Sequence, residues 1–530
     1  MDKLFWTFPS NNMADIQNYE KVKIDFHPKI PPLEKVKDKT KIDVRYCVIS
    51  PFAFIHVHWD EKIFELVYEI EEPILNEQEK SFLEQLTTAI RDLINFEGVI
   101  ERNEDVLLDY IDKRLKLLAV ELGIDIPYES YKKIYYYLCR DFIGVNEIEP
   151  ILRDYFVEDI ECNGANSPVY LIHRIYRNLR TSVVFQSNER LESLVEKLAQ
   201  RCGKHISYAD PILDGTLPDG SRVNATYTAD ITSKGPTFTI RKFTATPWTP
   251  VELISFKTLS PEMMAYLWIL VQYKMNILIT GGTASGKTTL LNAVAFFIPP
   301  EARVVSIEDT RELNLPRENW LPSVARGSTG GKGENEISLF TLLRSSFRQS
   351  PDYVIVGEVR GKEASVLFQG MASGHSSIST MHSDSVDTLI KRLETPPIEL
   401  SPTLLNVLDC VCIMTHAVVN KEETRKLREI VEIVNVDPNG IATINTPFTW
   451  NASEDKFYYK PGSKVFDKIS KRYGISVDEL ENEFRKRAQL IYELYKRKVF
   501  KFEDVQELAN RYYKKPDEVL KEFGIASQNI

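Results

Sequence analysis

Residues 277–291 read ILITGGTASGKTTLL. Within them Gly281, Gly286, Lys287 and Thr288 satisfy the pattern G-x4-G-K-[ST]. The pattern lies between an apolar run typical of a buried strand and a run compatible with a helix, which is the context that a phosphate-binding loop requires. Glycines let successive backbone N–H groups turn toward phosphate oxygens. A chance glycine-rich turn is the alternative, and it does not explain why strand, loop, Lys-Thr and helix occur in this order.

The loop predicts a binding site for ATP and Mg²⁺. The Lys287 ammonium is expected to reach the β and γ oxygens, and the Thr288 hydroxyl is expected to bind Mg²⁺. The residues expected to contact the nucleotide are Gly281, Gly282, Thr283, Ala284, Ser285, Gly286, Lys287, Thr288 and Thr289.

Composition narrows the class of protein. A chain of 530 residues is too long to fold around a single hydrophobic core, since one domain holds about 100–200 residues. The net charge of −10 argues against a general nucleic-acid-binding surface. No C-x-x-C pair occurs among the cysteines, so we expect neither a zinc ribbon nor a disulfide framework. Scattered free cysteines agree with a protein located in a reducing compartment. The first twelve residues lack the order of a signal peptide, and the most apolar stretch, 263–271, is too short to span a bilayer.

The chain changes pattern along its length. Strands are expected within 46–69 and helices within 77–122, followed by short strands and turns in 147–243. The segment TATPWTPVEL (244–253) has two prolines and no helix pattern, so it is interpreted as a linker. Apolar strands then alternate with helices, which predicts a parallel α/β sheet; these strands are Ile277–Thr280, Val304–Glu308, Val354–Val356 and Ser377–Met381. From about Val465 the chain is charged and helical, which favours a packed cap over a partner-binding arm.

Carboxylates follow two of the expected strands. VVSIEDTRELNL (304–315) places Glu308 and Asp309 after one strand, and YVIVGEVR (353–360) places Glu358 at the end of another. The carboxyl ends of parallel strands face the ligand crevice, so these groups are expected near the phosphates. An ordinary Walker B strand has aspartate where Gly357 stands, which leaves Glu358 as the acidic group near Mg²⁺. Glu308 or Glu358 could orient or deprotonate the attacking water, and the sequence does not choose between them.

Two histidines bracket a further strand. GHSSISTMHSDS (374–385) carries His375 and His382 on either side of a short β-like run. We interpret them as sensors of the γ-phosphate that couple the nucleotide state to movement. Plain packing is the alternative. A zinc site made by this pair is not expected, because no cysteine or third histidine lies nearby.

These four blocks in this order resemble the type II and type IV secretion ATPase superfamily. In that superfamily the P-loop is followed by an acidic box, a Walker B strand ending in Gly-Glu and a histidine box. The resemblance covers about residues 152–416, and FRQSPDYVIVGEVR (347–360) and ASGHSSISTMHSDS (372–385) carry it most specifically. Bacterial pilus and type II secretion members have a four-cysteine zinc insert, which this chain lacks. The resemblance therefore implies the archaeal branch, which assembles type IV pilus-like filaments and the archaellum.

The resemblance also implies roles for three arginines. LPDGSRVN (217–224) and FTIRKF (238–243) are similar to the N-terminal domain of the family, where arginines reach the phosphates. The resemblance implies this role for Arg222 and Arg241. It implies a phosphate-contact or subunit-contact role for Arg344. An arginine supplied from another domain or subunit stabilises transition-state charge and makes hydrolysis depend on assembly. Surface ion pairs are the alternative for each.

The fold implied is α/β: a RecA-like P-loop core with a parallel sheet, preceded by a smaller α+β domain and an N-terminal α+β extension, and followed by a C-terminal helical tail. The expected boundaries are 1–140 for the extension, 141–243 for the secretion-ATPase N-terminal domain, 244–258 for the linker, 259–450 for the ATPase domain and 451–530 for the helical region.

The function implied is that of a homohexameric ATP hydrolase in the cytoplasm. It would power assembly or secretion of filament subunits through a polytopic membrane platform protein, at the inner face of the cell membrane. A DNA-transfer ring translocase is one rival, which the acidic net charge disfavours. A nucleotide-gated scaffold with little turnover is another, which the intact Lys287, Thr288, Glu308 and Glu358 disfavour. No nucleic-acid partner is expected.

Overall fold

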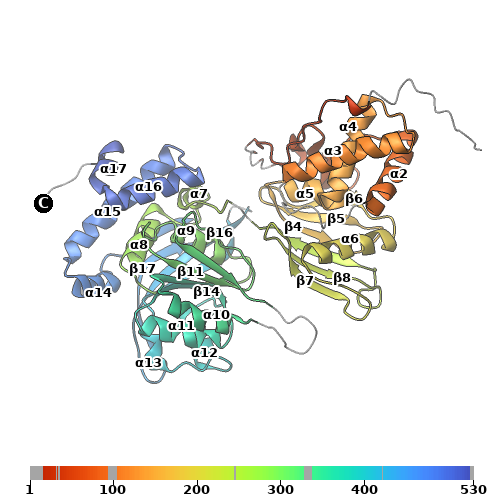
Figure 1. Ribbon diagram of the computed structural model, residues 1–530. Coiled ribbons are helices and arrows are strands. Elements are labelled where there is room, and N and C mark those ends of the chain that lie inside the picture. Colours follow the sequence, from red (N-terminus) through yellow and green to blue (C-terminus); the bar gives the residue numbers. More distant parts are fainter. Residues whose placement is uncertain are drawn as a thin grey trace, which may run out of the picture. The chain divides into compact units, whose positions relative to one another are not determined.

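The computed structural model describes residues 16–31, 33, 36, 38–93, 104–243, 246–326, 337–419 and 422–525. The chain forms two compact units, residues 1–243 and 244–530 (Figure 1). The first twelve residues, where a signal peptide was not expected, lie outside the described part, as does the start of the expected linker at 244–245. No helix in the described ranges has the length and apolar character needed to cross a bilayer.

The first unit contains one mixed sheet covered by helices. Its described strands run in the order β1-β2-β3-β6-β5-β4-β9-β8-β7. They are β1 Asp43–Ile49, β2 Ala53–Asp60, β3 Glu65–Glu71, β4 Val157–Cys162, β5 Pro168–His173, β6 Arg177–Val184, β7 Ile212–Thr216, β8 Arg222–Thr226 and β9 Thr237–Arg241. The helices are α2 Glu77–Leu93, α3 Glu104–Glu121, α4 Tyr128–Phe142, α5 Glu149–Arg153 and α6 Asn188–Arg201, with 3₁₀ turns η1 Lys39–Lys41 and η3 Asn146–Ile148.

Strands of the expected extension and of the expected following domain share this sheet. The parallel pairing of β3 with β6 joins them, with Val67 opposite Arg180 and Tyr68 opposite Thr181. Alternate residues of β2 and β8 enter a single apolar core, and most residues between them are partly or fully exposed. This alternation leaves one face of the sheet polar, as expected for a sheet packed on one side only.

The second unit is an α/β sheet in the order β12-β11-β13-β14-β10-β15-β16-β17-β18 for the described strands. Pairing is parallel from β12 to β15 and antiparallel from β15 to β18. The strands are β10 Ile277–Gly281, β11 Val304–Glu308, β12 Trp320–Val324, β13 Tyr353–Val359, β14 Ser376–Met381, β15 Cys410–Val419, β16 Glu422–Val436, β17 Ala442–Asn451 and β18 Lys456–Tyr459. The expected RecA-like parallel core is confirmed.

Helices cover both faces of the parallel strands. They are α7 Pro250–Ser255, α8 Pro261–Gln272, α9 Lys287–Ala295, α10 Leu339–Ser346, α11 Glu363–Ala372, α12 Val386–Glu394 and α13 Pro402–Leu405, with the 3₁₀ turn η4 Phe347–Gln349. Neighbouring strand residues enter opposite cores: Ile277 and Ile279 pack with α8, whereas Leu278 packs with α11 and α12. Burial on both faces explains why these strands are continuous apolar runs in the sequence.

The expected absence of a helix from 244–253 is wrong for the second half of that segment. Helix α7 begins at Pro250, and Thr249 with Glu252 forms a capping box. Proline at the first helical position costs no hydrogen bond, and the Thr-x-x-Glu spacing satisfies the exposed amides. A proline that suggested a linker therefore marks a helix start.

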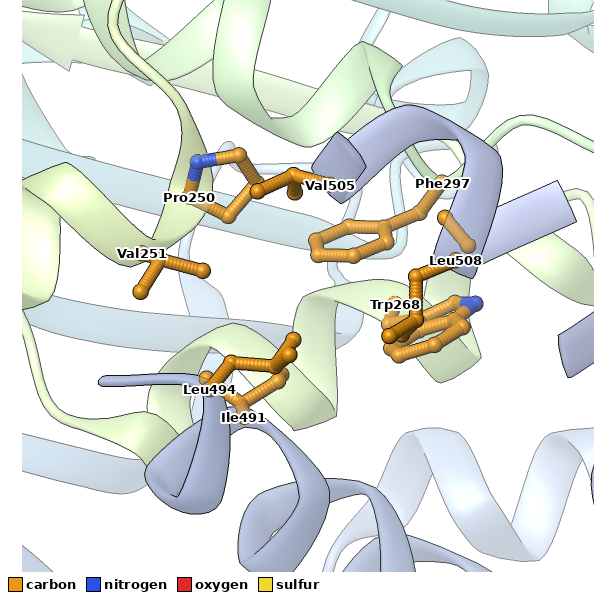
Figure 2. A pocket seen from close by; sticks show the side chains of 9 residues that line it. Pro250, Val251, Trp268, Phe297, Ile491, Leu494, Val505 and Leu508 are labelled. Carbon is orange, nitrogen blue, oxygen red and sulfur yellow. The ribbon is translucent and has the colours of Figure 1, made fainter. Parts of the chain in front are cut away.

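From Lys464 the C-terminal tail is helical and packs on the core, as expected; the start of the expected helical region 451–530 instead contains strand β18. The helices of the tail are α14 Lys464–Tyr473, α15 Val477–Lys496, α16 Phe502–Lys514 and α17 Pro516–Glu522. The ring of Trp268 in α8 stacks on Phe297 at 4.6 Å and lies 4.9 Å from the ring of Tyr512 in α16. Figure 2 shows a small apolar pocket at this junction, where Trp268 and Phe297 face Ile491 and Leu508 of the tail. The tail is therefore part of the hydrophobic core of the second unit.

Candidate functional site

Two glycines of the P-loop, at the end of β10 and after it, have positive φ angles. Gly281 has φ +149° and Gly286 has φ +93°, conformations that residues with a side chain rarely adopt. A Cβ on Gly281 would lie 2.4 Å from the carbonyl oxygen of Met414 in β15. Glycine is therefore required there by both conformation and space.

Helix α9 begins at this loop without a side-chain cap. Its N-cap residue is Gly286, whereas α8, α10 and α12 are capped by Ser260, Ser338 and Ser385. The first amides of a helix lack partners within the helix, and the helix dipole favours negative charge at this end. The arrangement leaves donors of α9 available to an anion such as phosphate.

Lys287 lies at the start of α9 with its ammonium turned back on the loop. Its Nζ donates to the carbonyl oxygens of Gly281 at 3.1 Å and Gly282 at 2.8 Å, and to Nδ1 of His382 at 3.3 Å. The residue is 8% exposed. Burial lowers the pKa of Lys287, while the nearby charge of Glu358 opposes this shift.

Glu358 and His382 complete a charged cluster at the carboxyl ends of β13 and β14. Nε2 of His382 lies 2.8 Å from Oε1 of Glu358, and the Arg360 guanidinium pairs with Oε2. Lysine offers only donors, so Nδ1 of His382 accepts and Nε2 carries the proton. Burial and then the Lys287 charge lower the pKa of His382. The His382 ring thus lies between the P-loop lysine and the Glu358 carboxylate.

The carboxylate of Glu358 stays ionised in this setting. Burial alone would raise its pKa, but the hydrogen bond and charge of Arg360, together with the Lys287 charge, lower it below the usual value. A carboxylate held ionised beside a P-loop is suited to a hard cation such as Mg²⁺.

The pKa of Glu308 shifts in the opposite direction to that of Glu358. Glu308 is 1% exposed at the end of β11, and Oε1 accepts from the amides of Glu312 and Leu313, each at 2.9 Å. Its other oxygen is buried without a hydrogen-bond partner in the described residues. Burial raises the pKa of Glu308 to about 7, against the lowering effect of the two amides. A carboxyl group that titrates near neutral pH is suited to proton transfer.

Gly357 makes room for Glu308. A Cβ at position 357 would lie 3.0 Å from Cγ of Glu308. The carbonyl of Gly357 also accepts a hydrogen bond from Thr380 in β14 at 2.7 Å. The glycine that departs from the ordinary Walker B pattern therefore allows β13 to pass close to a buried carboxyl group on β11.

Comparisons with known proteins agree with this architecture. A family model described as Type II/IV secretion system protein matches residues 144–457. The chain belongs to this family. Two relatives illustrate the match: the uncharacterized protein MJ0900 of Methanocaldococcus jannaschii is 35% identical over 466 residues, covering 86% of this chain and 81% of that protein. The type IV secretion system protein PtlH of Bordetella pertussis is 34% identical over 227 residues, covering 39% and 67%.

A solved structure is also similar to this secretion-family chain. It is the crystal structure of the VirB11 ATPase from the Brucella suis type IV secretion system in complex with sulphate. The two share 26% sequence identity, the similarity covers 53% of this chain and 91% of that chain, and the TM-score is 0.28.

The structure of this secretion-family member brings some expected site residues together. The P-loop, Glu308, Glu358 and His382 all lie at the carboxyl edge of the parallel strands, because β10, β11, β13 and β14 run in the same direction. His375 precedes β14 and so lies at the opposite edge. Its ring packs against Phe347 at 4.8 Å, and its Nδ1 is buried without a hydrogen-bond partner in the described part of the chain. The structure therefore does not place the two histidines in one site.

The three expected arginines belong to other elements than the P-loop cluster: Arg344 to α10, Arg222 to β8 and Arg241 to β9. Arg344 is exposed on α10, with its guanidinium 5.8 Å from the Phe340 ring centre. Arg222 and Arg241 belong to the first unit, where they are direct cross-strand partners on β8 and β9. Arg222 pairs with Asp214 at 3.1 Å. The cross-strand register places the two guanidinium groups on the same polar face of the sheet.

Two further residues of this secretion-family site were given no role from the sequence. Arg360 pairs with Glu358 and its Nη1 lies 3.8 Å from Asp309, so it joins the two acidic segments. Asn292 is buried in α9 and donates to the carbonyl oxygens of Thr288 and Glu312, each at 3.3 Å. A polar residue one turn after Thr288 in an apolar helix was the available signal for Asn292.

Proposed function

We propose that this chain is an ATP hydrolase that powers assembly or secretion of type IV pilus-like filament subunits. The observation that carries the proposal is the continuous contact from Lys287 through His382 to Glu358 at the carboxyl edge of the sheet. It couples a P-loop lysine to a carboxylate that belongs to a different strand. Membership of the type II/IV secretion family supports the process served.

The residues present fit a nucleotide with Mg²⁺. The uncapped start of α9 and the Lys287 ammonium offer donors and positive charge to phosphate oxygens. Thr288 and Glu358 would hold Mg²⁺, whose bound form neutralises charge on the phosphates. The donors are oxygen atoms, which this cation prefers.

The two carboxyl groups suit different roles. Glu358 is ionised and is placed to position a cation or water. Glu308 has a pKa of about 7 and a buried oxygen without a hydrogen-bond partner in the described residues. We assign the general-base role to Glu308, because a base works best with a pKa near the working pH. The decisive test of the function is Mg²⁺-dependent phosphate release by the purified chain, with the P-loop variant as the comparison.

The motor is proposed to act as a homohexamer on the cytoplasmic side of the membrane, through a polytopic platform protein and the filament-subunit machinery. Family membership supports such an assembly. Arg222, Arg241 and Arg344 are proposed to serve phosphate or subunit contacts in the ring, because an arginine supplied by another domain or subunit stabilises transition-state charge at the nucleotide.

Assembly dependence gives a test for the first two arginines. We expect ATPase activity to rise more than linearly with protein concentration where light scattering reports ring formation, and Arg222→Ala to lower activity in the assembled range. Arg190→Ala is the matched control, because Arg190 pairs with Glu147 on the surface and is 61% exposed. Strictly linear activity across the assembly range would contradict the proposal.

Alanine variants of His382 and His375 provide a matched test of the sensor role. We expect His382→Ala to impair filament assembly more than ATP affinity, because ATP binding rests on the P-loop amides and Lys287. His375→Ala should instead lower thermal stability, with a loss of roughly 0.5–3 kcal/mol, since its ring packs away from the cluster. Melting temperature, ATP affinity, hydrolysis and filament assembly are measured for both. Normal assembly and ATPase activity in His382→Ala would remove the sensor role.

A further inference from the structure

Two histidines and a glutamate come together on the polar face of the first unit, in a region that the ATPase proposal does not use. His56 and His58 lie two residues apart on β2, and Glu69 is the direct partner of His56 on β3. One nitrogen of each histidine and one carboxylate oxygen of Glu69 lie within 4.8 Å of one another. The alternation of a β-strand places both imidazoles on the same face, with ring centres 4.5 Å apart.

Asp43 sets which nitrogen of His56 donates. Nε2 of His56 lies 2.6 Å from Oδ1 of Asp43 on β1. A carboxylate only accepts, so Nε2 carries the proton and a neutral ring keeps its lone pair on Nδ1. That nitrogen faces carboxylates, since Oε2 of Glu69 is 4.0 Å and Oε1 of Glu71 is 3.8 Å away. A lone pair directed at carboxylates is unfavourable, so either a second proton or a bound cation is expected at Nδ1.

His58 supplies the second independent observation. Its Nδ1 is buried and has no hydrogen-bond partner in the part of the chain that the structure describes. A buried polar atom without a partner costs free energy, and a bound ion is one of the recognised explanations. Glu71, by contrast, is already engaged by the Arg45 guanidinium at 2.6 Å.

We propose that His56, His58 and Glu69 bind a zinc-class divalent cation. Two imidazoles with one carboxylate form a ligand set that Zn²⁺ favours, with a fourth position left for water. Asp43 acts as the outer carboxylate that holds the ligating ring of His56 in its tautomer. Donor atoms on a tetrahedral zinc ion lie about 3.4 Å apart, so Glu69, whose side chain is 48% exposed, must rotate to bring the set from within 4.8 Å into bonding range. The ion would tie β2 to β3.

The test is zinc titration of the tag-free full chain against a chromophoric chelator. Excess Mg²⁺ is present to occupy the oxygen-rich site at the P-loop. We expect one tightly bound Zn²⁺ per chain, loss of that site in His58→Ala and in Glu69→Gln, and roughly 10–100-fold weaker binding in Asp43→Asn. Glu71→Gln is the matched control and should bind zinc like the unchanged chain.

Two results would overturn the site. Equal zinc stoichiometry in the unchanged chain, His58→Ala and Glu69→Gln would place the metal elsewhere, for instance on cysteines. Absence of zinc binding by the unchanged chain would leave His56 as an ion-pair partner of Asp43 and Glu69. Glu69 is exposed, so Glu69→Gln keeps the test valid if His58→Ala fails to fold. Anomalous scattering at the zinc edge from a crystal of the full chain then locates the bound ion directly.

Discussion

The Lys287→Ala chain is expected to release no phosphate from ATP above background. In the unchanged chain the ammonium sits among the Gly281 and Gly282 carbonyls and next to His382, at the start of the uncapped helix α9. Alanine removes the positive charge opposite the β and γ phosphates and the donor that stabilises developing charge. Loss of one preorganised donor lowers turnover by about 10²–10³-fold, and this lysine also contributes to binding.

Lys274→Ala is the matched control for that measurement. Lys274 precedes β10, the strand that leads into the P-loop, but its ammonium pairs with Asp352 at 2.9 Å at the opposite edge of the sheet. We expect this variant to hydrolyse ATP like the unchanged chain. Phosphate release and binding of a fluorescent ATP analogue are measured for both variants. Hydrolysis by Lys287→Ala at the rate of the Lys274→Ala control would reject the P-loop assignment and with it the proposed function.

Local patterns in the sequence were enough to predict the core. The P-loop is contiguous, so its strand, glycines, lysine and helix could all be recognised from one stretch, and the structure has β10 and α9 there. The strand 304–308 was predicted with the bounds that β11 has. Since parallel strands end at the same edge, the sequence also predicted that Glu308 and Glu358 approach the P-loop.

Features that depend on distant packing could not be predicted in this way. The pairing of β3 with β6 joins segments more than a hundred residues apart in the sequence, and no local pattern encodes it. The two histidines look equivalent in the sequence, but a strand between them places His375 and His382 at opposite edges of the sheet. The raised pKa of Glu308 arises from burial, which depends on the whole fold and on the missing side chain at Gly357.

Glu308→Gln is expected to lower kcat by at least about 10²-fold, the scale of losing general-base catalysis. Glu358→Gln is expected to bind ATP and to hydrolyse it slowly, because it loses the charge that positions Mg²⁺ or water. The pH dependence should separate them. Burial raises the pKa of Glu308 to about 7, and a base works only when deprotonated, so kcat/KM of the unchanged chain should rise with pH through about 7. Glu308→Gln removes the titrating group and should flatten this rise. Glu358 has a lowered pKa and is ionised throughout this range, so Glu358→Gln should lower the rate at every pH and keep the rise.

Stability gives a second readout for Glu308 that does not require ATP. A carboxyl group whose pKa is raised on folding, from 4.5 to about 7, favours the folded state at low pH, and this contribution is lost as pH rises from about 4.5 through 7. As pH rises from 5 to 8, the unchanged chain should therefore lose stability relative to Glu308→Gln, by roughly 2 kcal/mol. The difference in melting temperature between the two chains measures this loss. Asp352→Asn is a suitable comparison, because the pKa of Asp352 is lowered and its removal should give no such relative gain in stability.

If the rise in kcat/KM near pH 7 persists in Glu308→Gln and disappears in Glu358→Gln, the general base is Glu358 and the assignment made from burial is wrong.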